Sequence, residues 1–122
     1  MIKILIVDDE IQIIRLLGQY LESKGYDVFT ATNGVEAIRE AQAIEPDVVL
    51  LDHIMPGMGG IEVLKAIKEF RPETVVIMLT AVIDESMIQA TLASGADDFI
   101  TKPFNLGDVD ASISKQLGSK QA

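Results

Sequence analysis

The chain has 122 residues, with 19 acidic and 10 basic side chains and a formal net charge of −9 at pH 7. So acidic a chain is a poor ligand for a polyanion, and we expect no direct nucleic-acid binding by this domain. It has no cysteine and one histidine, which excludes disulfides, thiolate metal sites and multi-histidine zinc sites. Its length and its 48% hydrophobic content suffice for one domain with a proper core.

The chain shows no targeting or membrane-spanning segment. The apolar start, Met1 to Val7, runs directly into acidic residues and has no small-residue cleavage site of the kind that ends a signal peptide. The longest uncharged apolar-rich run, Thr74 to Ile83, is about half as long as a transmembrane helix requires. We therefore expect a soluble, cytoplasmic protein that does not bind a membrane.

Short apolar runs alternate with segments of helical periodicity along the whole chain. The runs are rich in β-branched residues and too short for helices, so they predict strands. These strands are Ile2–Val7, Asp27–Ala31, Val48–Leu51, Val75–Leu79 and Asp98–Thr101. Apolar residues at helical spacing predict helices that include residues 11–21, 35–41, 61–67, 87–92 and 106–117.

Boundary residues agree with this alternation. Gly25 and Gly95 follow two of the helical segments as C-terminal stops, and Asn33 and Asp84 precede two others as N-caps. The run Val48–Leu51 is apolar on both faces, which is typical of a central parallel strand covered by helices on both sides. The pattern predicts an α/β sandwich of five strand–helix units.

Polar residues collect directly after the predicted strands. Asp8 and Asp9 follow the first strand, Asp52 the third, Thr80 the fourth and Lys102 the fifth. The carboxyl ends of parallel strands lie along one edge of the sheet, where ligands of such sheets usually bind. Clustered carboxylates repel one another unless a cation intervenes, and a few oxygen ligands favour Mg²⁺. The sequence therefore predicts a crevice that holds Mg²⁺, an ion that readily shares its ligand shell with a phosphoryl group.

Each of these residues also has an ordinary structural explanation. The acidic residues 8–10 fit as caps of the first helix, and Asp52 fits as a turn aspartate. Thr80 fits as a turn-closing hydroxyl, and Lys102 as a solvated surface lysine. A functional site is favoured because acidic, hydroxyl and ammonium groups are all expected at the same edge of the sheet.

With these motifs in view, the chain resembles the receiver domain of two-component response regulators from Ile2 to about Leu117. The matching motifs are Ile4–Glu10, Leu51-Asp52 with Met55-Pro56, Thr80-Ala81, and Gly95–Phe99 leading to Lys102-Pro103-Phe104. The resemblance implies a flavodoxin-like, doubly wound parallel sheet of five strands in the order 2-1-3-4-5, flanked by five helices. It assigns residues 1–117 to the receiver domain and leaves residues 118–122 as a polar tail or the start of a linker.

The resemblance also implies a chemistry for the acidic residues. Asp52 would be the nucleophile, accepting a phosphoryl group from a phosphohistidine. Asp9, Asp52 and the backbone carbonyl of Ile54 would bind Mg²⁺, and Asp8 would act mainly through metal-bound water. The domain would then be no enzyme in the ordinary sense, since it catalyses only its own phosphorylation and a slow dephosphorylation.

The remaining site residues would hold the phosphoryl group and transmit its arrival. The resemblance gives this role to Lys102 and the Thr80 hydroxyl, helped by the Ala81 amide, and it implies a cis peptide bond between Lys102 and Pro103. Movement of Thr80 would let Phe99 rotate inward and repack the face formed by the fourth helix, fifth strand and fifth helix.

The partners implied are a sensor histidine kinase or a phosphotransfer protein on one side. On the other side, the resemblance implies a downstream effector protein or a covalently linked output domain. A phosphorylation-dependent homodimer is a further expectation from the family, although the predicted fifth helix offers only Lys115 for pairing through basic residues.

Several positions depart from the family pattern or invite misreading. Gly59 stands where relatives usually carry aspartate, so the third helix loses a cap and we expect a more mobile loop. Ile54 and Val82 occupy the two positions whose side chains, in the family, often influence hydrolysis of the acyl phosphate. Both are apolar and cannot orient an attacking water, so we expect slow self-dephosphorylation. His53, beside the acceptor, is predicted to lie at the rim of the site and to bind neither metal nor phosphoryl.

Three other function classes use some of the same features. A phosphatase of the haloacid-dehalogenase type needs a second aspartate where this chain has Ile54, and a substrate cap for which there is no room. A flavodoxin-like electron carrier needs a Ser/Thr/Gly-rich phosphate loop after the first strand, where this chain has Asp8-Asp9. A phosphorylation-independent interaction module remains an alternative, because a complete pocket does not prove its use.

Overall fold

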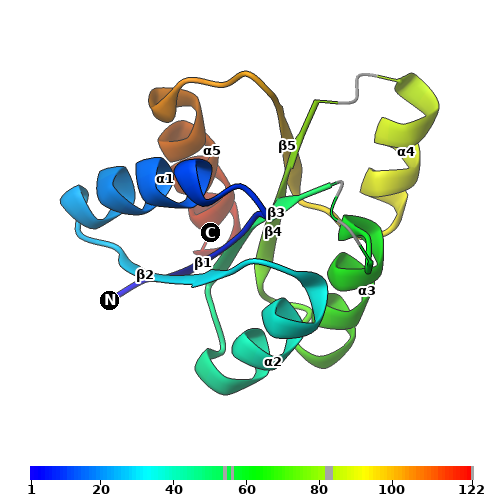
Figure 1. Cartoon of the computed structure of the whole chain (residues 1–122), viewed down its shortest axis with the longest axis horizontal. Coiled ribbons are helices and arrows are strands. Elements are labelled where there is room, and N and C mark those ends of the chain that lie inside the picture. Colours follow the sequence, from blue (N-terminus) through cyan, green and yellow to red (C-terminus); the bar gives the residue numbers. More distant parts are fainter. Residues whose placement is uncertain (54, 56, 82–83, 122) are drawn as a thin grey trace.

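The computed structural model describes residues 1–53, 55, 57–81 and 84–121. Within these residues strands and helices alternate along the chain (Figure 1). The elements are β1 (Lys3–Val7), α1 (Ile11–Ser23), β2 (Asp27–Ala31), α2 (Gly34–Ile44), β3 (Val48–Asp52), α3 (Gly60–Phe70), β4 (Val75–Thr80), α4 (Glu85–Ala93), β5 (Asp98–Thr101) and α5 (Leu106–Gln121).

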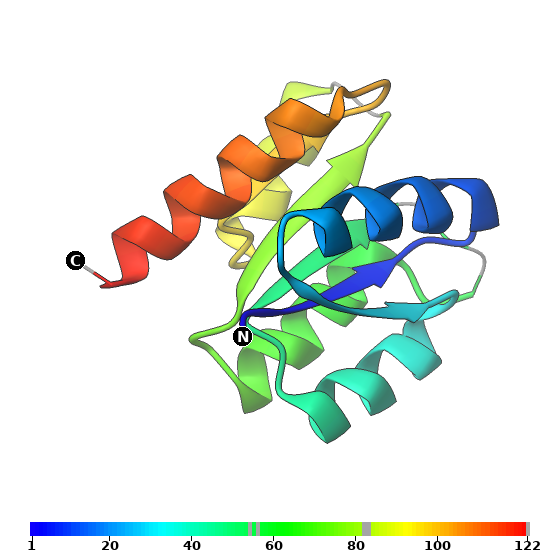
Figure 2. The ribbon, with the colours of Figure 1, turned by 90° about the vertical axis from the view of Figure 1, so that its left-hand side faces the viewer.

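The strands form one parallel sheet in the order β2-β1-β3-β4-β5. Helices α1 and α5 cover one face of the sheet, and α2 and α3 cover the other (Figure 2). The predicted fold class, strand order and helix number are confirmed. Because the order reverses between β1 and β3, the loops after these two strands diverge and leave a crevice at the carboxyl edge of the sheet.

Alternation along the strands divides the core into two layers. In β4, Val76 and Met78 face the layer under α2 and α3, whereas Ile77 and Leu79 face the layer under α1 and α5. All residues of β3 and β4 are buried, as predicted for central strands covered on both sides.

The observed strands run one residue further than predicted at two functionally relevant ends. β3 ends at Asp52 and β4 at Thr80, where the apolar pattern alone had ended each strand one residue earlier. Both polar residues are therefore held by the sheet ladder, with Asp52 opposite Leu79 and Thr80 opposite Thr101.

The predicted N-caps of α2 and α4 and the predicted stops after α1 and α4 are confirmed. The Asn33 side chain accepts a hydrogen bond from the Glu36 amide at 2.9 Å at the start of α2, and Asp84 accepts one from the Ser86 amide at 2.8 Å at the start of α4. Gly25 and Gly95 follow α1 and α4 with φ of 93° and 109°, a left-handed conformation that glycine adopts without strain.

The last helix extends beyond the predicted apolar face. α5 continues through Gln121, so residues 118–121, expected only as a polar tail, are helical. The helix thus includes Lys120 as well as Lys115. Whether a linker begins here stays a prediction.

Two helices that flank the crevice differ in how they are packed. α1 buries Ile14, Leu17, Gly18 and Leu21. In α4, all of whose residues are described, Thr91 alone is buried, and in Figure 1 this helix lies out at the margin of the molecule.

Candidate functional site

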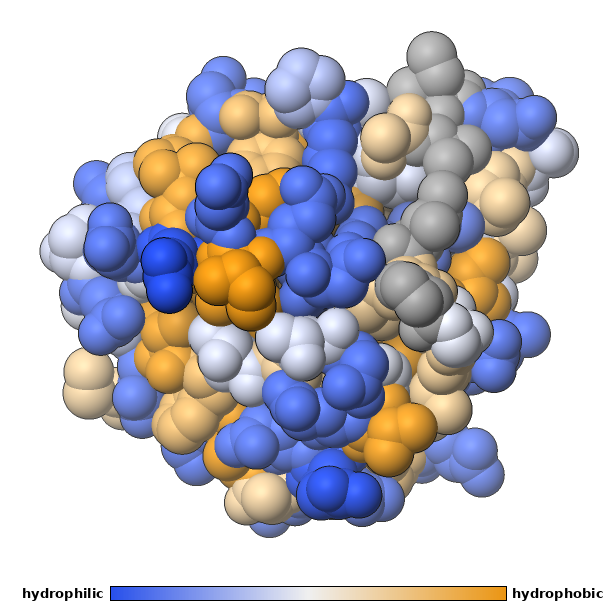
Figure 3. Space-filling model, in the orientation of Figure 1, coloured by the Kyte–Doolittle hydropathy of each residue, from blue (hydrophilic) through white to orange (hydrophobic). Residues whose placement is uncertain are grey.

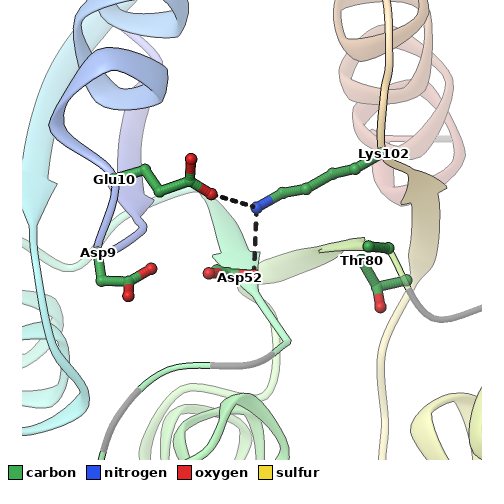
Figure 4. A pocket seen from close by; sticks show the side chains of 6 residues that line it. Asp9, Glu10, Asp52, Thr80 and Lys102 are labelled. Carbon is green, nitrogen blue, oxygen red and sulfur yellow. Dashed lines mark hydrogen bonds and ion pairs between the residues drawn. The ribbon is translucent and has the colours of Figure 1, made fainter.

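A pocket lies at the carboxyl edge of the sheet, where the loops after β1, β3, β4 and β5 meet. It is lined by Asp9, Glu10, Asp52, Thr80, Ala81 and Lys102 (Figure 4). The structure therefore brings together residues from four different strand ends, as the sequence predicted.

Lys102 connects the acidic side chains of this pocket. Its ammonium nitrogen lies 3.1 Å from an oxygen of Asp8, 3.3 Å from one of Asp52 and 3.8 Å from one of Glu10. Figure 4 shows the Lys102 side chain reaching from the β5 side across the pocket to Asp52 and Glu10. The interpretation of Lys102 as an ordinary solvated lysine is thereby wrong.

The surroundings of Lys102 favour its charged form. Burial is the strongest single influence and acts to lower the pKa of the ammonium group. Hydrogen bonds and charges from Asp8 and Asp52 act together in the opposite direction and raise the pKa above its ordinary value. The site therefore holds a fixed positive charge beside the Asp52 carboxylate.

Asp8, Asp9 and Glu10 form a cluster whose carboxylate oxygens lie within 4.8 Å of one another. Asp8 is fully buried and accepts hydrogen bonds from the Glu10 amide and from Lys102, whereas Asp9 and Glu10 are exposed. These are hard oxygen donors without a nitrogen or sulfur ligand, which fits Mg²⁺. Ile54, whose carbonyl was expected to complete the metal site, lies outside the described residues.

Glu10 is a pocket residue that sequence reasoning assigned only to helix capping. It occupies the N-cap position of α1 but makes no side-chain cap hydrogen bond, and its carboxylate is directed toward Lys102 instead. The position of Glu10 directly after the two predicted metal ligands, Asp8 and Asp9, could have identified it as a pocket residue.

The backbone after Asp52 is fixed by two hydrogen bonds and one close approach. The His53 amide donates to the Leu79 carbonyl at 3.1 Å, and the Gly60 amide donates to the His53 carbonyl at 3.0 Å. A Cβ atom at Gly60 would lie 2.5 Å from the Asp52 carbonyl oxygen, so α3 can approach β3 this closely only with glycine at its start. The preceding Gly59 makes no side-chain cap, which confirms that part of the prediction.

The loop after β5 is tied to the end of β4. The Lys102 amide donates to the Thr80 carbonyl at 2.7 Å, and the Lys102-Pro103 peptide bond is cis, as the family resemblance implied. Thr80 and Ala81 line the pocket next to Asp52. Thr80 and Lys102 are therefore neighbours at this edge of the sheet, as their positions after β4 and β5 predicted.

His53 and Phe99 lie in a second, apolar cavity between the sheet and α4. Its lining also includes Thr80, Thr91 and three apolar side chains, Met78, Met87 and Ile88. The rim position predicted for His53 is wrong, because its side chain is 8% exposed and faces this cavity. The His53 amide still bonds to β4, so the backbone at His53 continues the β3 pattern. Because successive side chains of a strand point to opposite faces of the sheet, the His53 side chain points away from that of Asp52. Burial lowers the pKa of the imidazole.

Thr80 lines both cavities, whereas Phe99 lines only the second one among those described. The predicted switch pair is thus brought into one cavity, with Thr80 as the residue shared with the Asp52 pocket. Phe99 is half-buried and packs against the core layer under α2 and α3.

Comparison with known protein families gives a direct match to this chain. The family model of the response regulator receiver domain matches residues 4–114. The chain belongs to this family. This confirms the resemblance drawn from the strand-end motifs and places the protein among two-component response regulators.

Individual relatives agree. The chain is 43% identical over 111 residues to the alkaline phosphatase synthesis transcriptional regulatory protein PhoP of Bacillus subtilis, covering 91% of this chain and 46% of PhoP. It is 40% identical over 118 residues to sporulation initiation phosphotransferase F of the same organism, covering 97% of this chain and 95% of that protein. A crystal structure of a two-component response regulator from Clostridium difficile superposes with a TM-score of 0.95 at 28% identity, covering 100% of both chains.

The chain spans about half or less of the length of the first curated relatives that it matches, 46% of PhoP among them. Membership of the family is consistent with phosphorylation-dependent signalling. Receiver domains interact with histidine kinases and phosphotransfer proteins and bind Mg²⁺ at an acidic pocket, and the cluster of residues 8–10 supplies such a pocket. None of the described helices is both long and apolar enough to cross a bilayer.

Proposed function

We propose that this receiver domain is a phosphorylation-dependent switch in which Asp52 accepts a phosphoryl group from the phosphohistidine of a histidine kinase or phosphotransfer protein. The observation that carries the proposal is the position of Lys102, whose ammonium group lies within 3.3 Å of both Asp8 and Asp52 at the carboxyl edge of the sheet. It presents a positive charge beside the one carboxylate that ends a central strand.

In the transfer, a carboxylate oxygen of Asp52 attacks phosphorus as the phosphorus–nitrogen bond of the donor breaks. The products are an aspartyl phosphate and a histidine whose ring takes up a proton from solvent. No general base is needed, since the nucleophile is an anion. At about 4 Å and an effective dielectric constant of about 20, each carboxylate–phosphoryl charge pair costs roughly 4 kcal/mol, so positive charge must compensate.

Two groups supply that compensation. Lys102 contributes a charge that its neighbours Asp8 and Asp52 stabilise. Asp8, Asp9, Asp52 and the carbonyl of Ile54 would hold Mg²⁺, which neutralises phosphoryl oxygens when it is bound. Catalysis in this scheme is positioning and charge neutralisation.

The phosphoryl oxygens would be received by Lys102, the Thr80 hydroxyl and the Ala81 amide. Because Thr80 also lines the cavity that contains Phe99, a shift of its side chain toward the phosphoryl group changes the packing around that ring. Inward rotation of Phe99 would then alter the surface formed by α4, β5 and α5, where an effector protein or a linked output domain would dock.

The surface beside the pocket suits a protein donor. An open apolar groove shares Glu10, Ala81 and Lys102 with the pocket and is otherwise lined by Ile13, Leu16, Pro103 and Phe104. Leu16 is 52% exposed. Figure 3 shows hydrophobic side chains next to hydrophilic ones on the face viewed there. A helical segment that carries the donor histidine would bury these side chains as it delivers the phosphoryl group to Asp52.

Slow loss of the phosphoryl group remains part of the proposal. Its basis is the apolar character of Ile54 and Val82, both outside the described residues. A phosphorylation-dependent homodimer is likewise kept as a proposal on family grounds alone.

The test is incubation with acetyl phosphate and Mg²⁺, followed by intact-mass measurement of the parent, Asp52→Asn and the matched control Asp108→Asn, which changes an exposed aspartate of α5. We expect one phosphoryl adduct in the parent and in the control, and none in Asp52→Asn or in samples treated with EDTA. An adduct that survives Asp52→Asn, or no adduct in any sample, would refute the proposal.

A further inference from the structure

The His53 ring is a buried polar group with no partner among the described residues. The side chain is only 8% exposed, and neither of its nitrogens has a hydrogen bond to a residue that the structure describes. A neutral imidazole offers one N–H donor and one acceptor, and native proteins pair the large majority of such buried groups. An unpaired buried group disfavours the arrangement in which it occurs.

The cavity around the ring holds groups that can supply the missing hydrogen bonds. The hydroxyl group of Thr91 lines the same cavity as His53, and the free space is about as large as one water molecule. The Thr91 hydroxyl donates to the Met87 carbonyl at 2.8 Å within α4, which leaves its oxygen able to accept a bond from an imidazole N–H.

The element that closes this cavity is weakly held. Thr91 is the buried residue of α4, and Met87 is 37% exposed. A small displacement of α4 therefore disturbs little packing. Such a displacement is also what would bring a hydroxyl group or a water molecule to the ring of His53.

We propose that His53 is a positioning residue that biases the domain toward its activated arrangement, because its ring, unpaired among the described residues, destabilises the resting packing under α4 and is satisfied by Thr91 or by a water molecule when α4 moves. The inference rests on the proposed function, since the activated arrangement is the one that phosphorylation of Asp52 selects. It is independent of the direct contacts of the phosphoryl group, because His53 faces the opposite side of the sheet.

Replacing His53 by an apolar residue should raise the stability of the resting domain, whereas replacing an ordinary core residue lowers it. An apolar side chain of similar size satisfies the cavity without needing a hydrogen bond, so it stabilises the resting arrangement. A receiver that spends less time in the activated arrangement should react more slowly with a small phosphoryl donor, because the observed rate scales with the population of the arrangement that reacts faster. Higher stability and slower phosphorylation should therefore occur together.

The experiment compares the parent with His53→Leu and His53→Gln, which keeps a donor and an acceptor. Three quantities are measured for each: the melting temperature without phosphoryl donor, the initial rate of adduct formation with acetyl phosphate and Mg²⁺, and amide hydrogen exchange of α4. We expect His53→Leu to melt at a higher temperature, to protect α4 more strongly and to form the adduct at least about fivefold more slowly. His53→Gln should stay near the parent in all three.

The outcomes separate this inference from the proposed function. A lower melting temperature of His53→Leu, its failure to fold, or an unchanged phosphorylation rate would overturn the role of His53, even if the parent is phosphorylated normally. Failure of the parent to form any adduct refutes the proposed function. The role of His53 in activation then fails as well, even if His53→Leu changes the hydrogen exchange of α4.

Discussion

Helices α1 and α4 flank the same end of the sheet, and they are attached to it very differently. α1 inserts Leu17 and Leu21, both fully buried, into the core, and the loop before it carries Asp8 and Asp9. α4 follows the loop after Thr80 and keeps most of its residues exposed. The charged half of the site is thus built on a firmly packed frame, whereas the half expected to report phosphorylation ends in a helix with little packing to lose.

The largest effect is expected from the residue that joins the two halves. Lys102→Met removes the positive charge next to Asp52 and should slow adduct formation with acetyl phosphate by about 10²–10³-fold, the loss typical of one preorganised electrostatic group. Lys115→Met, which removes an exposed lysine of α5, is the matched control and should react like the parent. Similar rates for the two variants would show that Lys102 has no electrostatic role.

Leucine truncation measures the difference between the helices directly. Leu17→Ala in α1 removes a fully buried side chain and should lower the free energy of unfolding by about 2–5 kcal/mol. Leu92→Ala in α4 removes one that is 38% exposed and should change it by less than about 0.5 kcal/mol. Urea denaturation gives both values, and equal losses would mean that α4 is packed as firmly as α1.

The N-cap of α4 should make this helix sensitive to acid. Hydrogen bonds from the Ser86 side chain and then from the Ser86 and Met87 amides hold the pKa of Asp84 below its ordinary value of 3.8. A carboxylate with a lowered pKa stabilises the folded helix fully above that ordinary value, and the contribution is lost as the pH falls through the lower folded pKa. Amide exchange protection of α4 should therefore decrease below pH 3.8.

Two comparisons check this acid sensitivity. Helix α2 is capped by Asn33, which has no charge to lose, and its first-turn Glu36 accepts one hydrogen bond among the described residues, from the Thr32 amide, so its protection should fall less with acid than that of α4. Asp84→Asn keeps a good N-cap and should remove the pH dependence from α4. Parallel loss of protection in α2 and α4 would contradict the assignment to Asp84.

The smallest expected effect concerns the cap that α3 lacks. Gly59 has extended backbone, and a Cβ atom there meets only ordinary contacts, so Gly59→Asn should raise the free energy of unfolding by a few tenths of a kcal/mol. Gly60→Ala, one residue later, would place a Cβ against the Asp52 carbonyl and should destabilise. If both substitutions behave alike, the close approach of α3 to β3 is not as described.

The fold could be predicted because its signals are local. Runs such as Val48–Leu51, apolar on both faces, and the caps at Asn33 and Asp84 identify a buried parallel sheet and its helices. Strand order is not local, since periodicity says nothing about which strands are neighbours. The order 2-1-3-4-5 came from the family resemblance and not from the pattern.

The pocket residues could be predicted from their positions after the strands, but side-chain direction could not. β3 runs one residue beyond its apolar run and the amide ladder continues to His53, so alternation sends that side chain to the opposite face from Asp52. The prediction placed His53 on a loop, where alternation does not apply, and therefore gave its side chain the wrong direction. Glu10 was missed for a related reason, because an acidic residue before a helix also fits a cap.

Amide hydrogen exchange with and without acetyl phosphate and Mg²⁺, in the parent and in Asp52→Asn, most directly tests whether a phosphoryl group at the polar pocket changes the distant face. We predict that exchange changes in α4 and β5 of the parent, stays constant in α1 and β1, and stays constant throughout Asp52→Asn. No change in α4 of a phosphorylated parent, or the same change in Asp52→Asn, would contradict the account.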